Sequence, residues 1–159
     1  MPETKECALR KVYPVGYGVE EARQYIDQLM KQADMLLIDT RFRPNSWRAE
    51  WRETALRKKY GNRYHWAGTY LGNVNYAGGP IQLADSEEGI RGLCLYLKEG
   101  HDLILLCQCP NYHTCHRKVI VDLLVQQTSV EVIHPEHAGR NAATITREKK
   151  AHVAMMKEN

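Results

Sequence analysis

The chain has 159 residues, 43% of them hydrophobic and 26% charged, with a formal net charge of +3. This length and composition fit one domain with a single core and exclude a disordered chain. No apolar run approaches the roughly 18–20 residues of a membrane-spanning helix, and residues 1–11 are too polar for a signal peptide. Five cysteines without such a signal are typical of a reducing compartment, so we expect a cytoplasmic protein with no membrane partner.

Apolar runs alternate with amphipathic stretches along the chain, which is typical of βαβ units. The apolar runs predict strands over residues 12–15, 34–39, 63–66, 102–107 and 130–133. Helical spacing predicts helices over 20–32, 47–60, 85–100 and 115–127, whereas 68–80 reads as a loop. We therefore expect a three-layer, Rossmann-like α/β sandwich around a mostly parallel sheet over 1–139. A basic C-terminal helix or tail is expected over 140–159.

Positive charge is concentrated in two segments. Residues 41–63 contain eight Lys or Arg against two Glu, and residues 140–159 contain five against two. In the first segment Asn45 and Ser46 are expected to cap a helix in which basic residues interleave with aromatic ones. That composition suits nucleic acid, through phosphate contacts and base stacking. It equally suits a core face of Trp47, Trp51 and Leu56 with a solvated basic face opposite.

Most of the chemistry-bearing residues lie in one loop, CQCPNYHTCHR, between Cys107 and Arg117. It follows a buried strand and runs into a helix, the place where ligands bind in open α/β sheets. The free N–H groups at the start of the helix attract an anion, and Arg117 adds a fork-shaped donor for phosphate or carboxylate. The loop therefore predicts a ligand site at the carboxyl edge of the sheet.

Three interpretations of this loop remain open. In the first, Cys115 or Cys107 is a nucleophile whose thiolate is favoured by the helix N-terminus, Arg117 and His116. In the second, zinc binds to a set of thiolates and one imidazole. Its ligands would be Cys107, Cys109 and Cys115 with His113, or with His116 in its place. In the third, the cysteines are small buried packing residues.

The strand LILLC, followed after seven residues by Cys-His-Arg at 115–117, resembles the signature of the domain of unknown function 488 family. The segments VGYG at 15–18 and LLIDTR at 36–41 are similar to that family's first two strands. Pro44 with Ser46 resembles the family's proline- and serine-containing turn, and His65 followed by Leu-Gly at 71–72 resembles its segment of tyrosine or histidine and then Leu-Gly. The resemblance spans 13–134 and implies the fold and the position of a site, but no reaction. Family members often carry an acid where this chain has Cys109.

The remaining marked residues fall at strand ends that a parallel sheet brings to one edge. We expect Arg41 and Arg117 to hold one anion between them, and Asp39 to orient an arginine or to act as an acid/base. Tyr17 and His65 are expected to stack on a ring or donate a hydrogen bond. The glycines beside Tyr17 permit a tight turn. The ligand-binding residues predicted here are Gly16, Tyr17, Arg41, His65 and Arg117.

These residues predict a pocket for a phosphorylated small molecule or a nucleotide. If the protein is an enzyme, it is a hydrolase or transferase, with Cys115, Cys107, His116 and Asp39 as catalytic residues. One alternative is a nucleic-acid-binding module without catalysis. Another is a structural zinc or thiol-redox site at Cys107 and Cys115.

Overall fold

The structure, a computed structural model, describes residues 9–135, so the basic helix or tail expected over 140–159 lies outside the described residues. Strands and helices alternate along the chain. The strands are β1 (Lys11–Gly16), β2 (Met35–Asp39), β3 (Tyr64–Trp66), β4 (Asp102–Cys107) and β5 (Glu131–Val132). The α-helices are α1 (Ala22–Leu29), α2 (Glu53–Tyr60), α3 (Gly68–Leu71), α4 (Ser86–Lys98) and α5 (His116–Gln127). Short 3₁₀ helices are η2 (Ala49–Trp51), η3 (Gly61–Arg63) and η4 (Tyr112–Thr114).

The five strands form one sheet in the order β3-β2-β4-β1-β5, and every described pair is parallel. In this order β4 is the central strand, with two strands on each side. Every residue of β2 and β4 is buried, which explains their uninterrupted apolar runs. Cys107, the last residue of β4, therefore lies in the middle of the carboxyl edge and pairs with Gly16 of β1.

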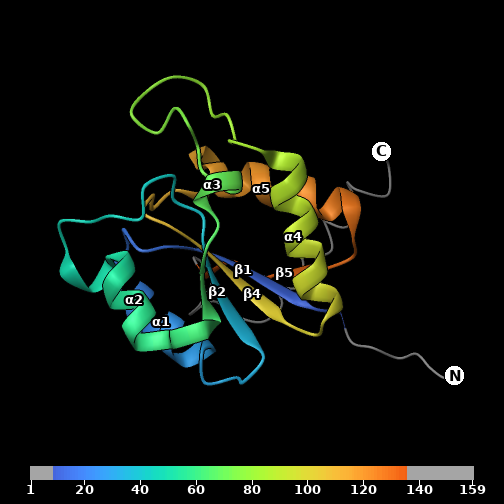
Figure 1. The fold of residues 1–159 in the computed structure, drawn as a ribbon, viewed down its shortest axis with the longest axis horizontal. Helices are drawn as coiled ribbons and strands as arrows, with labels where there is room; N and C mark the ends of the chain where they lie inside the picture. Colours follow the sequence, from blue (N-terminus) through green and yellow to red (C-terminus); the bar gives the residue numbers. More distant parts are fainter. Residues whose placement is uncertain (1–8, 136–159) are drawn as a thin grey trace, which may run out of the picture.

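Two apolar cores flank the sheet, because successive strand residues face opposite sides. Leu36 and Ile38 pack in one core, with residues of α3, α4 and α5. Met35 and Leu37 pack in the other, with residues of α1 and α2. Figure 1 shows α1 and α2 on one side of the strands and α3, α4 and α5 on the other. The expected three-layer α/β fold is confirmed, and the sheet is parallel throughout the described chain.

The basic helix is shorter than the sequence predicted. Residues 49–51 form η2, and α2 begins only at Glu53, after an extended Arg52. Ser46 does not cap a helix. Its hydroxyl accepts a hydrogen bond from the Arg48 N–H at 3.1 Å, which closes a local turn instead. The loop expected over 68–80 also contains a regular element, the short helix α3.

None of the helices within 9–135 is both long enough and apolar enough to cross a membrane.

Candidate thiolate site

A cavity of about 540 Å³ opens at the carboxyl edge of the sheet. Its floor comes from the end of β4 and the start of α5, and its wall comes from the segment after β2 and from the loop at 73–76. Cys107 ends β4, and Cys115 is the N-cap residue of α5. The lining residues are Arg41, Phe42, Arg43, Asn45, Asn73, Tyr76, Cys107, Gln108, Cys109, Pro110, Thr114, Cys115 and His116.

Gly16 and Gly18 hold the cysteine loop close to β1, and neither has a positive φ. The Tyr17 N–H donates to the Cys107 carbonyl at 2.8 Å, and the Gly18 N–H donates to the Gln108 carbonyl at 2.9 Å. A Cβ on Gly16 would lie 1.9 Å from the Cys109 carbonyl oxygen. The expected turn is present, with the Val19 N–H donating to the Gly16 carbonyl at 3.5 Å, but it needs no positive φ, so these glycines serve mainly the close approach of the two backbones.

The sulfurs of Cys107 and Cys115 lie 3.4 Å apart, so one thiol can donate its hydrogen to the other sulfur. Cys107 is 7% exposed and Cys115 is 4% exposed. The Sγ of Cys115 also accepts from Arg117, from Nε at 3.2 Å and from the backbone N–H at 3.5 Å. Two N–H donors of Arg117 therefore converge on the Cys115 sulfur, and donors of this kind favour its thiolate.

Arg117 is one of the most buried side chains, at 1% exposure. Its Nη2 donates to the Cys109 carbonyl at 2.8 Å, and its Nε is the donor to Cys115 described above. The ion pairs found within 9–135 include Arg41 but not Arg117. A buried guanidinium needs a compensating charge, and the Cys115 sulfur is the group in position to supply it.

The same contacts shift the pKa values of the two thiols in opposite directions. The hydrogen bond from Cys107, with further contributions from His116 and Arg117, lowers the pKa of Cys115 to about 3, although burial acts in the opposite direction. The hydrogen bond to Cys115, together with burial, raises the pKa of Cys107 well above its usual value. Of the two sulfurs, Cys115 is therefore the one whose surroundings favour the thiolate.

His116 sits beside both sulfurs with its tautomer fixed by Thr40. Its Nε2 lies 2.8 Å from the Thr40 carbonyl, which only accepts, so Nε2 carries a hydrogen. The Thr40 hydroxyl donates its own hydrogen to the Leu106 carbonyl at 2.8 Å. The other ring nitrogen, Nδ1, lies 3.7 Å from each of the two sulfurs, where a neutral ring accepts a hydrogen from a thiol and a protonated ring donates one to a thiolate.

Asp39 and Arg41 form a buried ion pair beside the cavity. Arg41 donates from Nε to Oδ1 at 2.8 Å and from Nη2 to Oδ2 at 2.6 Å. Burial opposes the charge of Arg41, but the hydrogen bonds and charge of Asp39 outweigh it and raise the pKa of Arg41. The Tyr64 hydroxyl donates to the same carboxylate. Asp39 therefore orients an arginine, one of the two roles expected of it.

Tyr17 and His65 are not among the residues that line the cavity. Tyr17 is buried in the core, stacked on Trp51 with ring centroids 4.6 Å apart, and its hydroxyl accepts from Arg41 Nη1 at 3.3 Å. His65 does not line the cavity. Its ring lies 5.1 Å from that of Tyr96, and burial, followed by nearby cations, lowers the pKa of His65. Both were expected to contact a ligand, and that role stays a prediction.

A metal ion could be held by Cys107, Cys115 and His116, whose ligand atoms all lie within 4.8 Å of one another. Of the predicted ligands, Cys107 and Cys115 belong to this cluster, as does His116, which was the alternative to His113, whereas Cys109 and His113 do not. The thiol of Cys109 donates to the Asn111 carbonyl at 3.4 Å, and exposed His113 packs its ring edge-on to Tyr112. The first turn of α5 brings His116 to the sulfurs in their place.

Arg43, Asn45 and Tyr76 line the cavity, although no role in a site was predicted for them from the sequence. Arg43 is exposed on the cavity wall, and its guanidinium lies 5.8 Å from the centre of the Tyr76 ring. Phe42 lies against the same ring, with centroids 5.9 Å apart. The expected pair of anion binders, Arg41 and Arg117, already has partners within the fold. The one available signal for Arg43 was its position two residues beyond the strand-end Arg41.

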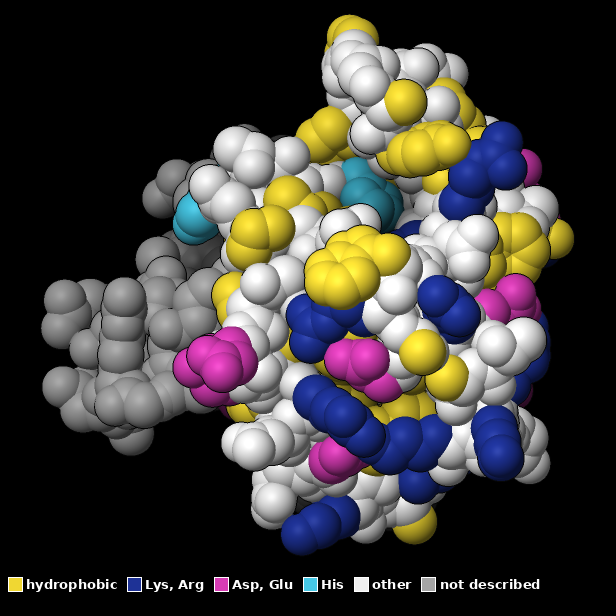
Figure 2. All heavy atoms as spheres, turned by 90° about the vertical axis from the view of Figure 1, so that its left-hand side faces the viewer, with side chains coloured by type: hydrophobic (Ala, Val, Ile, Leu, Met, Phe, Trp, Pro, Cys, Tyr) yellow, Lys and Arg dark blue, Asp and Glu magenta, His cyan; other side chains and the backbone are white. Residues whose placement is uncertain are grey.

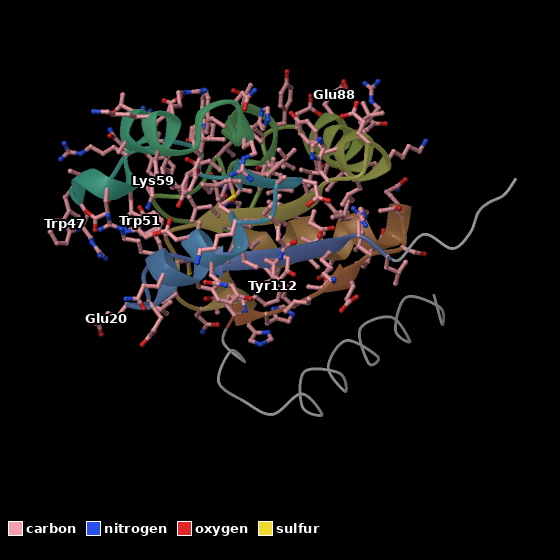
Figure 3. All side chains as sticks on the ribbon, turned by 90° about the horizontal axis from the view of Figure 1, so that it is seen from below. Glu20, Trp47, Trp51, Lys59, Glu88 and Tyr112 are labelled. Carbon is pink, nitrogen blue, oxygen red and sulfur yellow. The ribbon has the colours of Figure 1, made fainter. Side chains whose placement is uncertain are left out.

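The basic segment 41–63 is largely paired with other groups of the fold. Figure 2 shows acidic side chains directly beside Lys and Arg on the face that carries α2. The ion pairs there are Arg48–Glu50 at 3.1 Å, Arg57–Glu53 at 2.7 Å and Lys59–Asp27 at 2.7 Å. Trp51 is buried as a core residue, whereas Trp47 is 82% exposed and lies at the outer margin of the molecule in Figure 3. Nucleic-acid binding through this face stays a prediction.

Comparison of the chain with protein-family models, curated proteins and solved structures found no match. The resemblance to the domain of unknown function 488 family therefore stays a prediction.

Proposed function

We propose that this protein is a thiolate-dependent enzyme in which Cys115 is the nucleophile, acting on a small anionic substrate bound at the carboxyl edge of the sheet. The observation that carries this proposal is the fully buried Arg117, whose Nε donates to the Cys115 sulfur at 3.2 Å. A thiolate that serves as the counter-ion of a buried arginine is already ionised when the substrate arrives.

His116 supplies the acid/base function in this proposal. Its Nδ1 lone pair lies 3.7 Å from Cys107 and from Cys115, so it can take a proton from a thiol and return it to a leaving group. The hydrogen bond from Nε2 to the Thr40 carbonyl stabilises the imidazolium that forms. Such a base contributes on the order of 10²–10⁴-fold to a reaction rate.

Arg43 favours a substrate with a negative charge. It is exposed at the cavity wall and has no carboxylate partner among the ion pairs of the described residues. The neighbouring rings of Phe42 and Tyr76 offer an apolar surface next to this cation. The anion is therefore proposed to bind at Arg43, and the reacting atom at Cys115.

Zinc is the second candidate, because Cys107, Cys115 and His116 offer three ligands of the kind that zinc prefers. The charges weigh against it. Two thiolates neutralise a divalent ion completely, which leaves the buried Arg117 without a counter-ion. With one thiolate and one thiol, by contrast, the single negative charge neutralises Arg117, and none is left to neutralise a metal ion.

The thiolate state of Cys115 predicts an unusual pH profile of alkylation. With iodoacetamide, the rate at Cys115 is expected to stay constant between about pH 5 and pH 8, whereas an ordinary thiol slows about tenfold for each pH unit below its pKa. The measurement is peptide-resolved mass spectrometry over a time course. Cys94, a thiol outside the cavity whose pKa is raised by burial, is the internal reference.

A Cys115 profile that falls in parallel with that of Cys94 would contradict the thiolate assignment. Alkylation that is blocked in the purified protein and appears only after chelation, with one zinc released for each chain, would favour the metal site instead.

A further inference from the structure

The second thiol, Cys107, is not required for nucleophilic catalysis by Cys115, yet its sulfur lies 3.4 Å from that of Cys115. A disulfide needs about 2.0 Å between the sulfurs, so rotation of the two side chains must shorten the distance by about 1.4 Å. Cys107 lines the same cavity as Cys115. Any covalent adduct formed on Cys115 is therefore within reach of a second sulfur before water has to act on it.

From this geometry we propose that Cys107 is a resolving thiol and that the reaction is thiol–disulfide exchange with a small, carboxylate-bearing disulfide. The inference rests on the proposed function of Cys115 as nucleophile and names its substrate class. Disulfide exchange is favoured over hydrolysis of the adduct on Cys115, because a thiol whose sulfur lies only 3.4 Å away attacks that adduct first.

The exchange balances in two steps. In the first, the Cys115 thiolate attacks one sulfur of the substrate R–S–S–R′. The Cys115–S–R bond forms, the S–S bond of the substrate breaks, and R′–S⁻ leaves with the electron pair. The protein and the substrate fragment R are then joined as a mixed disulfide.

In the second step the proton of Cys107 passes to His116 Nδ1, 3.7 Å away, and the resulting thiolate is in the field of Arg117. Cys107 attacks the Cys115 sulfur, the bond to R–S breaks, and R–S⁻ takes the proton back from Nδ1. The two cysteines have been oxidised to a disulfide, and the substrate disulfide has been reduced to the thiol R–SH and the thiolate R′–S⁻, which takes its proton from water. A small dithiol reductant returns the protein to its starting state by the same exchange in reverse.

Arg43 and the adjacent rings fit the rest of such a substrate. The cation lies on the cavity wall and is exposed, so a carboxylate bound there keeps part of its hydration. The Phe42 and Tyr76 rings beside it cover an apolar linker between that carboxylate and the reacting sulfur. Oxidised glutathione is a small disulfide with carboxylates at its ends, and it serves as the probe of this substrate class.

The test is the reaction of reduced protein with excess oxidised glutathione, followed by intact-mass and peptide mass spectrometry. The unmodified chain is expected to release two glutathione molecules and to end with a Cys107–Cys115 disulfide. The Cys107→Ser variant is expected to release only one and to keep a glutathionyl group on Cys115. Cys94→Ser is the matched control, which should behave as the unmodified chain does.

The outcomes separate the two proposals. If the unmodified chain retains glutathione on Cys115 while Cys107 stays reduced, the resolving role is overturned and the nucleophile stands. If Cys115 does not react and Cys115→Ser changes nothing, both proposals fail. The substrate class has its own readout. Arg43→Ala should slow the reaction with oxidised glutathione but not with the uncharged 2-hydroxyethyl disulfide, and an equal effect on both would exclude recognition of the carboxylate.

Discussion

Replacing Cys115 by serine is expected to destabilise the protein by about 3–5 kcal/mol, the usual cost of leaving one buried charge of a pair without its partner. Serine can still cap α5, where the Cys115 sulfur now accepts the Arg117 N–H, but it stays neutral and leaves the buried guanidinium unpaired. Denaturation in urea, read as the free energy of unfolding, measures the loss.

A double-mutant cycle isolates the interaction between the two residues. Arg117→Met removes the charge and keeps most of the buried side-chain volume, and it is expected to be destabilising by itself because the hydrogen bond to the Cys109 carbonyl is lost. In the double variant no charge is left unpaired, so the cost should be smaller than the sum of the single costs by roughly 1–3 kcal/mol. Additive costs would show that Cys115 is not the counter-ion of Arg117.

The stability that the Cys115–Arg117 pair contributes depends on pH. The folded state lowers the pKa of Cys115 to about 3, so its ionisation contributes stability that is complete above the pKa of the thiol in the unfolded chain, about 8.5. This contribution declines as the pH falls toward the folded value. The stability difference between the unmodified chain and Cys115→Ser should therefore shrink between about pH 8 and pH 4. A constant difference would argue against an ionised Cys115.

The second large effect is expected at Asp39. In Asp39→Asn an amide replaces a fully buried carboxylate that accepts hydrogen bonds from Arg41 and Tyr64. Arg41 is left charged and unpaired, and an amide hydrogen faces a donor. We expect a loss of about 3–5 kcal/mol, a large part of the stability of a domain of this size. The free energy of unfolding, or the soluble yield if the variant is too unstable to purify, reports this loss.

Glu53→Gln is the matched control. Glu53 also pairs with an arginine, Arg57, at 2.7 Å, but both side chains are partly exposed on α2. Solvent screens this pair, so the cost should be about 0.5 kcal/mol or less. If Asp39→Asn lowers the free energy of unfolding by no more than this control does, burial does not make the Asp39–Arg41 pair contribute more to stability than an exposed pair. Recovery of stability in Asp39→Asn with Arg41→Met would attribute the loss to the unpaired charge.

The order of strands and helices could be read from the sequence because local pattern encodes it. The run DLILLC predicted β4 without error, since a strand covered on both faces has no polar side to interrupt it. The start of α2 could not be predicted in this way. Ser46 has the chemistry of a helix cap, but its hydroxyl is used in a local turn with Arg48, and the basic helix begins seven residues later, at Glu53.

The sequence by itself also predicted that the side chains of the candidate site lie at one edge of the sheet, because residues at the ends of parallel strands must meet there and the Cys-His-Arg segment closely follows the clearest strand. Only the tertiary structure decided which of these side chains act together. It paired Arg41 with Asp39 and Arg117 with Cys115, and it brought His116 to the sulfurs in place of His113. These choices depend on burial and on distances between elements far apart in the chain, where a charge without a partner is costly, and no local pattern records them.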